Sequence, residues 1–240
     1  MVNQSMRKSL FILVVLGLVV SSFPICASAQ NASVSDIVIR RFAKQVFNRI
    51  ALNADGDSCP GKDFYTLSAF LIALKYYTQF GKLSSIEDSK REIAAAFAHF
   101  AHETGNFCYI EEIGGQYRDY CDKSKGQYPC NPNKKYYGRG PIQLTWNYNY
   151  GPCGQSNGFD GLNYPEIVAI NPVISFRTAL WYWLLFVRPV INQGFGATIR
   201  VINGALECDG KNPSAVQARV KYYLYYCRVL KVTPGYNIYC

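Results

Sequence analysis

Glu103 stands where a carboxylic acid could be kept protonated near neutral pH. It follows the alanine-rich stretch 93–102 and directly precedes Thr104-Gly105, so its carboxyl group would emerge where a buried helix ends. Burial and the negative end of the helix dipole both penalise the ionised form, which is how proteins obtain a general acid. Position alone favours the ordinary alternative, a glutamate that ends a helix in water.

A second acidic position, the pair Glu111-Glu112, lies in the segment 108–113, which we expect to be extended. Side chains alternate between the two faces of an extended segment, so only one of the pair can point into a cleft. Two carboxylates brought together across a polar cleft suggest glycoside hydrolysis, in which one protonates the leaving oxygen and the other activates water or attacks directly. Paired glutamates are common, and on their own they indicate this chemistry only weakly.

The segment 136–151 alternates aromatic rings with amide and hydroxyl groups. Rings can cover the faces of sugars, and amides can bond their hydroxyl and N-acetyl groups, so this composition favours a carbohydrate cleft. The alternative is a tyrosine-rich core tied together by disulfides.

Other chemistries find less support. His99 and His102 stand three residues apart, but Glu103 lies outside the pair and no third ligand accompanies them, so we expect neither metal nor cofactor. No Cys-x-x-Cys pair indicates zinc, and no Gly-x-Ser-x-Gly indicates a serine nucleophile. The basic residues are scattered, which argues against a nucleic-acid partner; attraction to an acidic matrix explains the positive charge better.

The elements that must position these side chains are mainly helical. Apolar residues recur at helical spacing in five stretches bounded by capping or stop signals, and the middle of the chain, 106–172, is irregular apart from short extended pieces at 108–113 and 142–145. The predicted helices run from Ser35 to about 53, over 66–79, from Glu87 to about His102, over 175–187, and from Pro213 to about Leu230. The predicted caps are Ser35, a capping box at 84–87, and Asn212.

Residues 1–29 have the build of a secretory signal peptide, with Arg7 and Lys8, an apolar run at 10–20 and a small-residue cleavage site at 27–29. A membrane anchor is the alternative, but an anchor needs about 18 to 20 apolar residues. This run has 11, so we expect cleavage after Ala29 and no membrane association.

Cleavage would change the counts that describe the chain. The 240 residues become 211, the formal charge falls from +9 to +7 with the loss of Arg7 and Lys8, and the nine cysteines become eight with the loss of Cys26. An even number in an oxidising compartment predicts a disulfide framework, whose connectivity the spacing cannot assign. We expect a short N-terminal segment at 30–35 and one domain at 36–240.

Several longer motifs together resemble a known family. They are His102-Glu103-Thr104-Gly105, the segments 107–112, 136–151 and 202–208, and Ala218-Arg219-Val220. In these motifs the chain resembles the plant chitinases of glycoside hydrolase family 19 over about 36–240, and it is most similar to the class IV members. The resemblance implies a mainly α (α+β), lysozyme-like fold with two helical lobes flanking a long substrate cleft. It also implies an endochitinase that cleaves internal β-1,4 bonds of chitin with inversion.

The resemblance further implies roles for individual residues. Glu103 would be the general acid and Glu112 the general base, and Thr145 would help to hold the attacking water. The residues implied to bind substrate are His102, Gln143, Tyr148, Asn149 and Asn203. Those implied to support the two acids are Glu207, Arg219 and Arg139, together with His102. Inversion predicts carboxyl groups about 6.5 to 9.5 Å apart, wide enough for a water between them.

Three features depart from the family pattern. Class IV chitinases usually begin with a hevein-type chitin-binding domain, whereas only 31–35 separates the predicted signal from the catalytic domain, so we expect weaker binding to insoluble chitin. Thr145 stands where serine is commoner, and it keeps the hydroxyl but adds a methyl. Cys153 replaces a residue that is usually alanine.

The family pattern also implies how the cysteines pair. The implied disulfides are Cys59–Cys108, Cys121–Cys130 and Cys208–Cys240. Cys153 and Cys227 are left over, and we favour two buried free thiols over a fourth bridge.

We therefore expect a secreted, monomeric enzyme that acts on chitin and chitooligosaccharides. A chitinase-like protein that binds glycans without hydrolysis is the alternative, motivated by Thr145 and the missing binding domain, and action on bacterial peptidoglycan is a third. The chain stops at Cys240 without a vacuolar tail, which favours the cell exterior over the vacuole, and Asn31-Ala32-Ser33 is a glycosylation sequon.

Overall fold

Residues 34–51 and 58–240 are described by the structure, a computed structural model of the 240-residue chain. The predicted signal peptide, its cleavage site and the Asn31 sequon lie outside these residues. Within them, no helix is long and apolar enough to cross a membrane.

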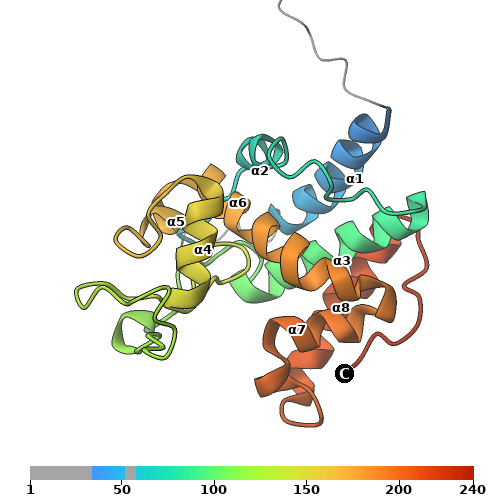
Figure 1. Cartoon of the computed structure of the whole chain (residues 1–240). Helices are drawn as coiled ribbons and strands as arrows, with labels where there is room; N and C mark the ends of the chain where they lie inside the picture. The colour runs from blue at the N-terminus through green and yellow to red at the C-terminus, as the bar shows by residue number, and fades with distance from the viewer. Residues whose placement is uncertain (1–33, 52–57) are drawn as a thin grey trace, which may run out of the picture. The chain divides into compact units, whose positions relative to one another are not determined.

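The described residues are mainly helical, as predicted (Figure 1). The α-helices are α1 (Val34–Ala51), α2 (Leu67–Ala73), α3 (Ile86–Thr104), α4 (Asn147–Asn157), α5 (Ile167–Ile170), α6 (Pro172–Tyr182), α7 (Phe195–Glu207) and α8 (Pro213–Val229). A 3-10 turn, η1, covers Gly115–Tyr117. The chain leaves α6 through a π-helical turn, η2 (Trp183–Val187), and a 3-10 helix, η3 (Arg188–Gln193). The two short extended pieces are present only as isolated bridges, in which both Glu111 and Leu144 pair with Arg139.

The helix boundaries follow local signals with small shifts. Asn212 caps α8, as predicted, by accepting from the backbone N–H of Ala215 at 3.1 Å. The cap of α3 is Ser85, which accepts from the N–H of Asp88, so the predicted box lies one residue further along. α1 begins at Val34, so the prediction of Ser35 as its cap was wrong.

The second predicted helix is shorter than expected. Thr66 caps α2, but α2 ends at Ala73 rather than near Gln79. From Lys75 onward, backbone N–H groups bond carbonyls three residues back, as in consecutive turns, and these turns carry the chain to Gly81.

Helix α3 lies at the centre of the fold. Its residues 92–101 are all buried, which confirms that the alanine-rich helix is internal. It packs against α1 on one side and α8 on the other, and Phe97 joins a cluster of ring contacts with Phe47 and Phe70. Aromatic pairs of this kind contribute about 0.5–1.5 kcal/mol each beyond the area that they bury.

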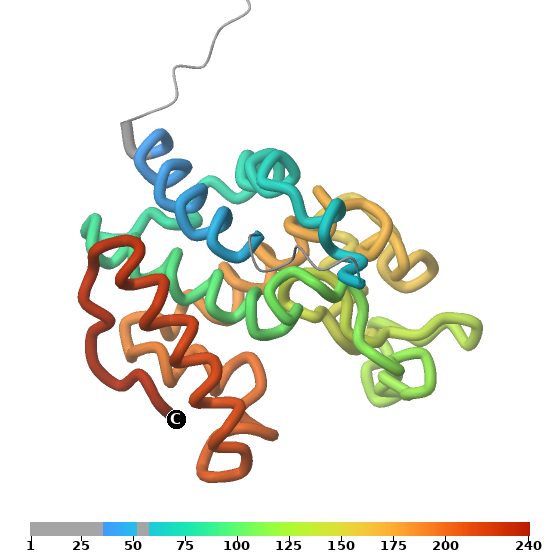
Figure 2. The backbone as a smooth tube through the Cα atoms, turned by 180° about the vertical axis from the view of Figure 1, so that it is seen from behind, coloured from blue at the N-terminus to red at the C-terminus, as the bar shows by residue number. Residues whose placement is uncertain are grey.

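The remaining helices form two groups. α2, α4 and α5 pack against α6, whereas α7 packs against α8. Figures 1 and 2 show the first group on the opposite side of α3 from α7, with the long segment 106–146 beside α4. These two groups correspond to the two predicted lobes.

Three disulfides tie this arrangement together, and they are the pairs that the resemblance implies: Cys59–Cys108, Cys121–Cys130 and Cys208–Cys240. Cys153 and Cys227 are buried free thiols, so the structure holds no bridge between them. Burial raises the pKa of both thiols, which makes them poor nucleophiles.

Candidate active site

Glu103 emerges from the last turn of α3, at the end of a helix that is otherwise buried. Gly105 stops the helix in a left-handed conformation with φ of 57°, which a glycine adopts without strain. The Glu103 side chain is 17% exposed, and its Oε1 atom accepts from the Nη2 atom of Arg219 at 2.5 Å. The carboxyl group is therefore held on one oxygen and reaches solvent.

The environment of Glu103 favours its protonated form. Burial raises the pKa of this carboxyl, and the nearby Glu207 charge raises it further, while Arg219 opposes the rise without cancelling it. The acid suspected from sequence thus has the property that proton donation requires.

Arg219 is the centre of a buried charge network. It is 1% exposed, and its Nε and Nη2 atoms donate to the two oxygens of Glu207, both at 2.7 Å. Burial disfavours the guanidinium charge, but Glu103 and Glu207 outweigh that effect and raise the pKa of Arg219. Burial raises the pKa of Glu207 too, yet the bonds from Arg219 and Asn203 leave it below its ordinary value. Glu207 is therefore the charged partner of Arg219, and Glu103 is free to carry a proton.

The two histidines take part in this network rather than in a metal site. His99 is fully buried, with Nε2 2.8 Å from Thr198 Oγ1 and Nδ1 3.1 Å from Arg219 Nη1. Thr198 donates its own proton to the carbonyl of Phe195, so its oxygen must accept from the Nε2–H of His99. The Nδ1 atom is then free to accept from Arg219, which assigns a neutral ring.

Charge considerations agree with neutral histidines. Burial and Arg219 hold the pKa of His99 well below its usual range. Burial and Arg219 also lower the pKa of His102 to about 4, although Glu207 opposes the change. Among residues 34–51 and 58–240, no group of three potential metal-binding side chains lies together.

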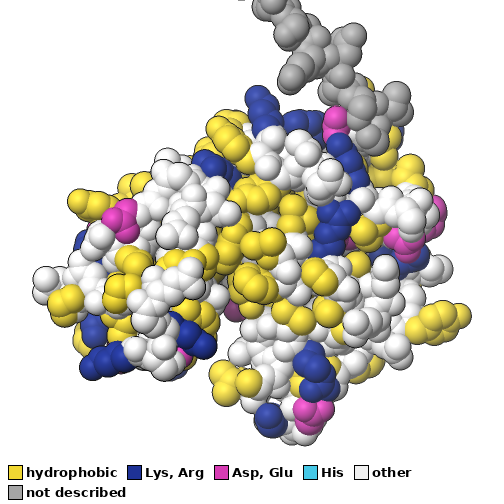
Figure 3. Space-filling view, viewed as in Figure 1, with side chains coloured by type: hydrophobic (Ala, Val, Ile, Leu, Met, Phe, Trp, Pro, Cys, Tyr) yellow, Lys and Arg dark blue, Asp and Glu magenta, His cyan; other side chains and the backbone are white. Residues whose placement is uncertain are grey.

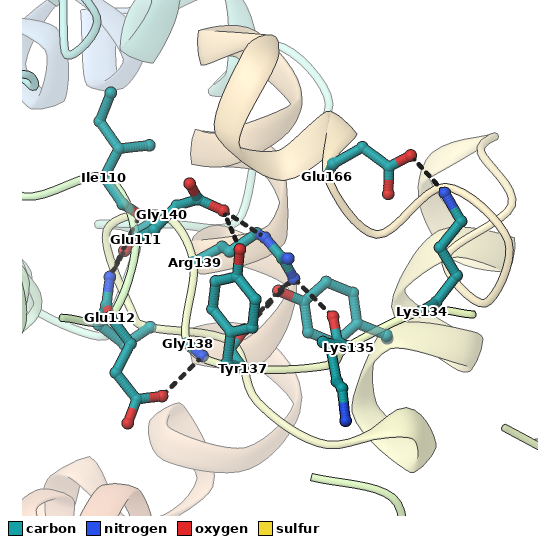
Figure 4. Close-up of polar contacts among 12 residues, drawn as sticks. Ile110, Glu111, Glu112, Lys134, Lys135, Tyr137, Gly138, Arg139, Gly140 and Glu166 are labelled. Carbon is teal, nitrogen blue, oxygen red and sulfur yellow. Dashed lines mark hydrogen bonds and ion pairs between the residues drawn. The ribbon is translucent and has the colours of Figure 1, made fainter. Parts of the chain in front are cut away.

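Glu112 is positioned by the irregular segment that follows α3. Its backbone N–H bonds the carbonyl of Gly138 at 2.8 Å, and its Oε2 atom accepts from the N–H of Gly138 at 3.2 Å. Its Oε1 atom accepts from the hydroxyl of Tyr120 at 2.8 Å, with Arg118 3.6 Å away. Figure 4 shows Glu111 and Glu112 pointing to opposite sides of their segment, as the alternation of an extended chain predicts.

Arg139 pairs with Glu111 and takes no part in the network around Arg219. Its Nε atom donates to Glu111 at 2.8 Å, its guanidinium lies 3.7 Å from the centre of the Tyr137 ring, and Nη1 donates to Tyr150 at 3.0 Å (Figure 4). Arg139 is 4% exposed and lies in both β-bridges of the segment. It therefore fixes the backbone that carries Glu112.

Thr145 is oriented by its own hydrogen bond. Its hydroxyl donates to the carbonyl of Gln143 at 2.7 Å, so its oxygen remains free to accept a hydrogen bond from a water. Asn149 donates to the Thr145 carbonyl at 2.8 Å, which leaves its side-chain oxygen for a ligand. The side-chain N–H groups of Gln143 donate to the carbonyls of Gly140 and Ile110, at 3.0 and 3.4 Å. These bonds hold the Gln143 amide inside the loop.

The last implied site residue, Asn203, interrupts α7. Its φ and ψ of −147° and 27° are not helical, and its side chain donates to Glu207 at 2.7 Å. The kink places an amide beside the charge network, where only its oxygen is left for another partner.

Comparison with known proteins shows the family of the chain. The family model for glycoside hydrolase family 19, described as chitinase class I, matches residues 41–190 and 189–240. The chain belongs to this family of chitinases. It is 61% identical over 212 residues to "Endochitinase EP3" of Arabidopsis thaliana, covering 88% of this chain and 76% of the relative. It is 58% identical over 213 residues to "Chitinase 4" of Oryza sativa subsp. japonica, covering 89% and 73%.

Solved structures give the same result for the fold. A class IV family 19 chitinase from Zea mays has a TM-score of 0.77 at 54% identity, covering 81% of this chain and 94% of that one. Chitinase C from Streptomyces griseus has a TM-score of 0.71 at 39% identity, covering 81% and 78%. This family 19 chitinase is therefore a glycoside hydrolase with the predicted lysozyme-like fold.

Two tyrosines of the chitinase site were missed from sequence. Tyr120 bonds Glu112 and meets the Trp146 ring at 5.2 Å edge to face, and Trp146 stacks on Tyr148 at 5.8 Å. Burial raises the pKa of Tyr182, and the nearby Tyr148 and Glu103 raise it further. A row of three rings, Tyr120, Trp146 and Tyr148, thus begins at Glu112, while Tyr182 lies close enough to Glu103 to feel its charge. Tyr120 lies among other tyrosines and Tyr182 in an apolar stretch, and nothing in either sequence marks the ring as one that lies near the acids.

The surface is hollowed between the two lobes. Figure 3 shows the hollow between α7, which carries Glu207, and the segment 106–146 beside α4, with hydrophobic side chains gathered at its inner end over α6.

Proposed function

We propose that this protein is an endochitinase that hydrolyses internal β-1,4 bonds between N-acetylglucosamine units of chitin by an inverting general acid and general base mechanism. The observation that carries the proposal is Glu103, a half-buried carboxyl with a raised pKa, held on one oxygen by Arg219. The similarity to an endochitinase of Arabidopsis thaliana and a chitinase of Oryza sativa subsp. japonica supports the substrate.

Glu103 would be the proton donor. An arginine can only donate, so the oxygen that accepts from Arg219 does not carry the proton of the neutral acid. The proton therefore sits on Oε2, the oxygen without an arginine partner. Glu103 Oε2 would protonate the glycosidic oxygen, and Arg219 would stabilise the carboxylate that is left behind.

Glu112 would be the base. Its two oxygens are oriented by Tyr120 and Gly138, and inversion requires a water between Glu112 and the sugar, on the face opposite Glu103. Glu112 would take one proton of that water, and Thr145 would accept a hydrogen bond from the other O–H, since its own hydroxyl already donates to Gln143. With two carboxylates in these roles, the reaction would need no cofactor.

The sugar units would lie on the ring row and its polar neighbours. Trp146 and Tyr148 offer stacked faces, and the free amide oxygens of Asn149 and Asn203 can accept from sugar hydroxyl or N-acetyl N–H groups. His102, neutral beside the acid, can bond a hydroxyl without adding charge. Gln143 would act mainly by shaping the loop under Thr145.

The test is hydrolysis of a chitin hexamer by the mature protein, with the products separated by length and anomer. We expect internal cleavage with an initial α-anomer and, in Glu103→Gln and Glu112→Gln, a loss of about 10²–10⁴-fold. Glu111→Gln is the matched control, because Glu111 faces Arg139, and it should keep most of the activity. An initial β-anomer would refute inversion, and no cleavage by the parent would favour a glycan-binding protein instead.

We further propose that the chitinase is a secreted monomer. The signal-like composition of residues 1–29 supports export, and the three disulfides among the described residues suit an oxidising compartment. Recovery of the protein in the culture medium with a new N-terminus near Gln30, and the mass of one chain in solution, would test both points.

A further inference from the structure

The outer face of α8 carries a groove that the chitinase site does not use. Five of its residues, Ser214, Gln217, Lys221, Leu224 and Arg228, recur at three or four residues and so lie on one side of the helix. Each of them is exposed, whereas Val216, Arg219, Val220 and Tyr223 on the inner side are buried. α8 therefore presents one face to the catalytic network and another to solvent.

The C-terminal segment forms the second wall of the groove. It runs back along α8 (Figure 2), where Tyr239 lines the groove together with Tyr225 of the helix. The contacts that fix the segment include the Cys208–Cys240 disulfide, a 2.8 Å bond from the N–H of Gly196 to the carbonyl of Asn237, and a 2.8 Å bond from the Tyr223 hydroxyl to the carbonyl of Pro234. The groove, of about 690 Å³, is thus formed before any ligand arrives.

The chemistry of the groove is cationic and aromatic. Lys221 and Arg228 are its two charged residues, and in the described part of the chain no carboxylate lies within ion-pairing distance of either. The nearest acids in sequence, Glu207 and Asp209, are taken by Arg219 and Arg200. Tyr225 and Tyr239 remain 41% and 59% exposed, so both rings are open to a ligand.

We propose that this groove binds an acidic polysaccharide, a chain of uronic acid sugars. Each unit of such a chain offers an apolar ring face for a tyrosine and a carboxylate for Lys221 or Arg228. Chitin itself carries no negative charge, so it would leave both cations without a partner. After loss of Arg7 and Lys8 the mature enzyme keeps 23 basic against 16 acidic residues, an excess that hydrolysis of a neutral polymer does not explain and that would help to retain the enzyme in an acidic matrix.

The experiment measures binding of the mature protein to polygalacturonate at about 0.01 M and about 0.15 M salt, over which the Debye length falls from about 30 Å to about 8 Å. Lys221→Gln combined with Arg228→Gln should weaken binding about tenfold at the lower salt. The matched control removes the same charge elsewhere, with Lys62→Gln and Lys75→Gln, two exposed lysines outside the groove. The control should bind within about twofold of the parent.

Two further arms test sugar recognition. Tyr225→Ala and Tyr239→Ala should each weaken binding about three- to tenfold, since each removes a stacking ring. Every variant should hydrolyse the soluble chitin hexamer like the parent, which shows that it is folded and keeps this test separate from the proposed catalytic function. Equal losses in the groove and control lysine variants would overturn the proposal, as would unchanged binding by the tyrosine variants. Polyglutamate bound as tightly as polygalacturonate would overturn it as well.

Discussion

Replacement of Glu207 by glutamine tests how the structure keeps Glu103 protonated. Glu103 Oε1 and Glu207 Oε1 both accept from the Nη2 atom of Arg219, at 2.5 and 2.7 Å, so the two oxygens are no more than about 5 Å apart. Glu207 carries the negative charge of the pair, and that charge raises the pKa of Glu103. Glu207→Gln removes the charge, and it leaves Arg219 with Glu103 as its one carboxylate partner. Both changes favour ionised Glu103.

The size of the effect follows from Coulomb's law. Two unit charges about 5 Å apart, at an effective dielectric constant of about 20, repel by about 3 kcal/mol. Glu103 is 17% exposed, and solvent will screen part of this repulsion. We therefore expect the alkaline limb of the kcat/KM profile, where the general acid loses its proton, to move about one to two pH units toward lower pH.

The assay is the pH dependence of chitin hexamer hydrolysis by the parent and by Glu207→Gln, with melting temperatures recorded at each pH. Activity of the variant should approach that of the parent as the pH falls, because protonation restores the acid. The control is Glu92→Gln, which changes a fully buried carboxylate held by Arg188 and Trp183 and should leave the profile in place. A limb that stays fixed, or a loss of rate that is uniform with pH, would refute the assignment of Glu207 as the charge that tunes Glu103.

Three other predictions follow from contacts of single residues. Thr145→Val should lower kcat about tenfold in the hexamer assay through loss of the acceptor for the attacking water, while Thr145→Ser keeps the rate. Burial raises the pKa of Glu92 against the pull of Arg188, so its protonated form stabilises the fold at low pH. That stability is lost as the pH rises from about 4 through the raised pKa, and thermal melting should show a smaller loss in Glu92→Gln. Replacing Cys208 and Cys240 by serine opens a loop with a sequence separation of 32 residues and should reduce the free energy of unfolding by about 3–4 kcal/mol in denaturant titrations.

The helices that sequence reasoning found are those whose signals are local. The buried faces of α3 and α8 and the Asn212 cap can be read along the chain, and they are where expected. Helix α4 could not be found in this way, since it contains Gly151, Pro152 and Gly154, which disfavour an isolated helix. The absence of a side chain at Gly154 lets another part of the chain pack directly against the helix, because a Cβ atom there would lie 2.5 Å from the backbone of Gly161. Tertiary packing thus overrides local preference in the segment beside the cleft.

In the candidate site, too, the features with a local signal can be predicted from the sequence and those that depend on tertiary contacts cannot. The sequence indicates two acids and a sugar-like surface, and the resemblance supplies a role for each residue. Neither the sequence nor the resemblance shows that Arg139 pairs with Glu111, whereas Arg219 pairs with Glu207. Both arginines are buried, and only their contacts in the structure distinguish their roles. Likewise, the spacing of His99 and His102 on one helix raises the possibility of a metal site. The partners that His99 actually has, Thr198 and Arg219, lie about a hundred residues away in sequence and could not be predicted from that spacing.

The alanines of α3 connect the packing of the fold with the chemistry of the acid. Arg219 comes from α8, which packs against α3, and its guanidinium bonds both His99 and Glu103, four residues apart on one face of α3. Ala95, one turn before His99, lies on the same face, where its small side chain lets the two helices approach closely. Larger residues there would move α8 outward and separate Arg219 from Glu103, leaving a charge that is 1% exposed with fewer partners. An unpaired buried charge costs several kcal/mol, so the same contact that stabilises the helix pair also sets the proton affinity of the acid. The alanine run, which indicates only a buried helix when read alone, is therefore a requirement for the acid that follows it.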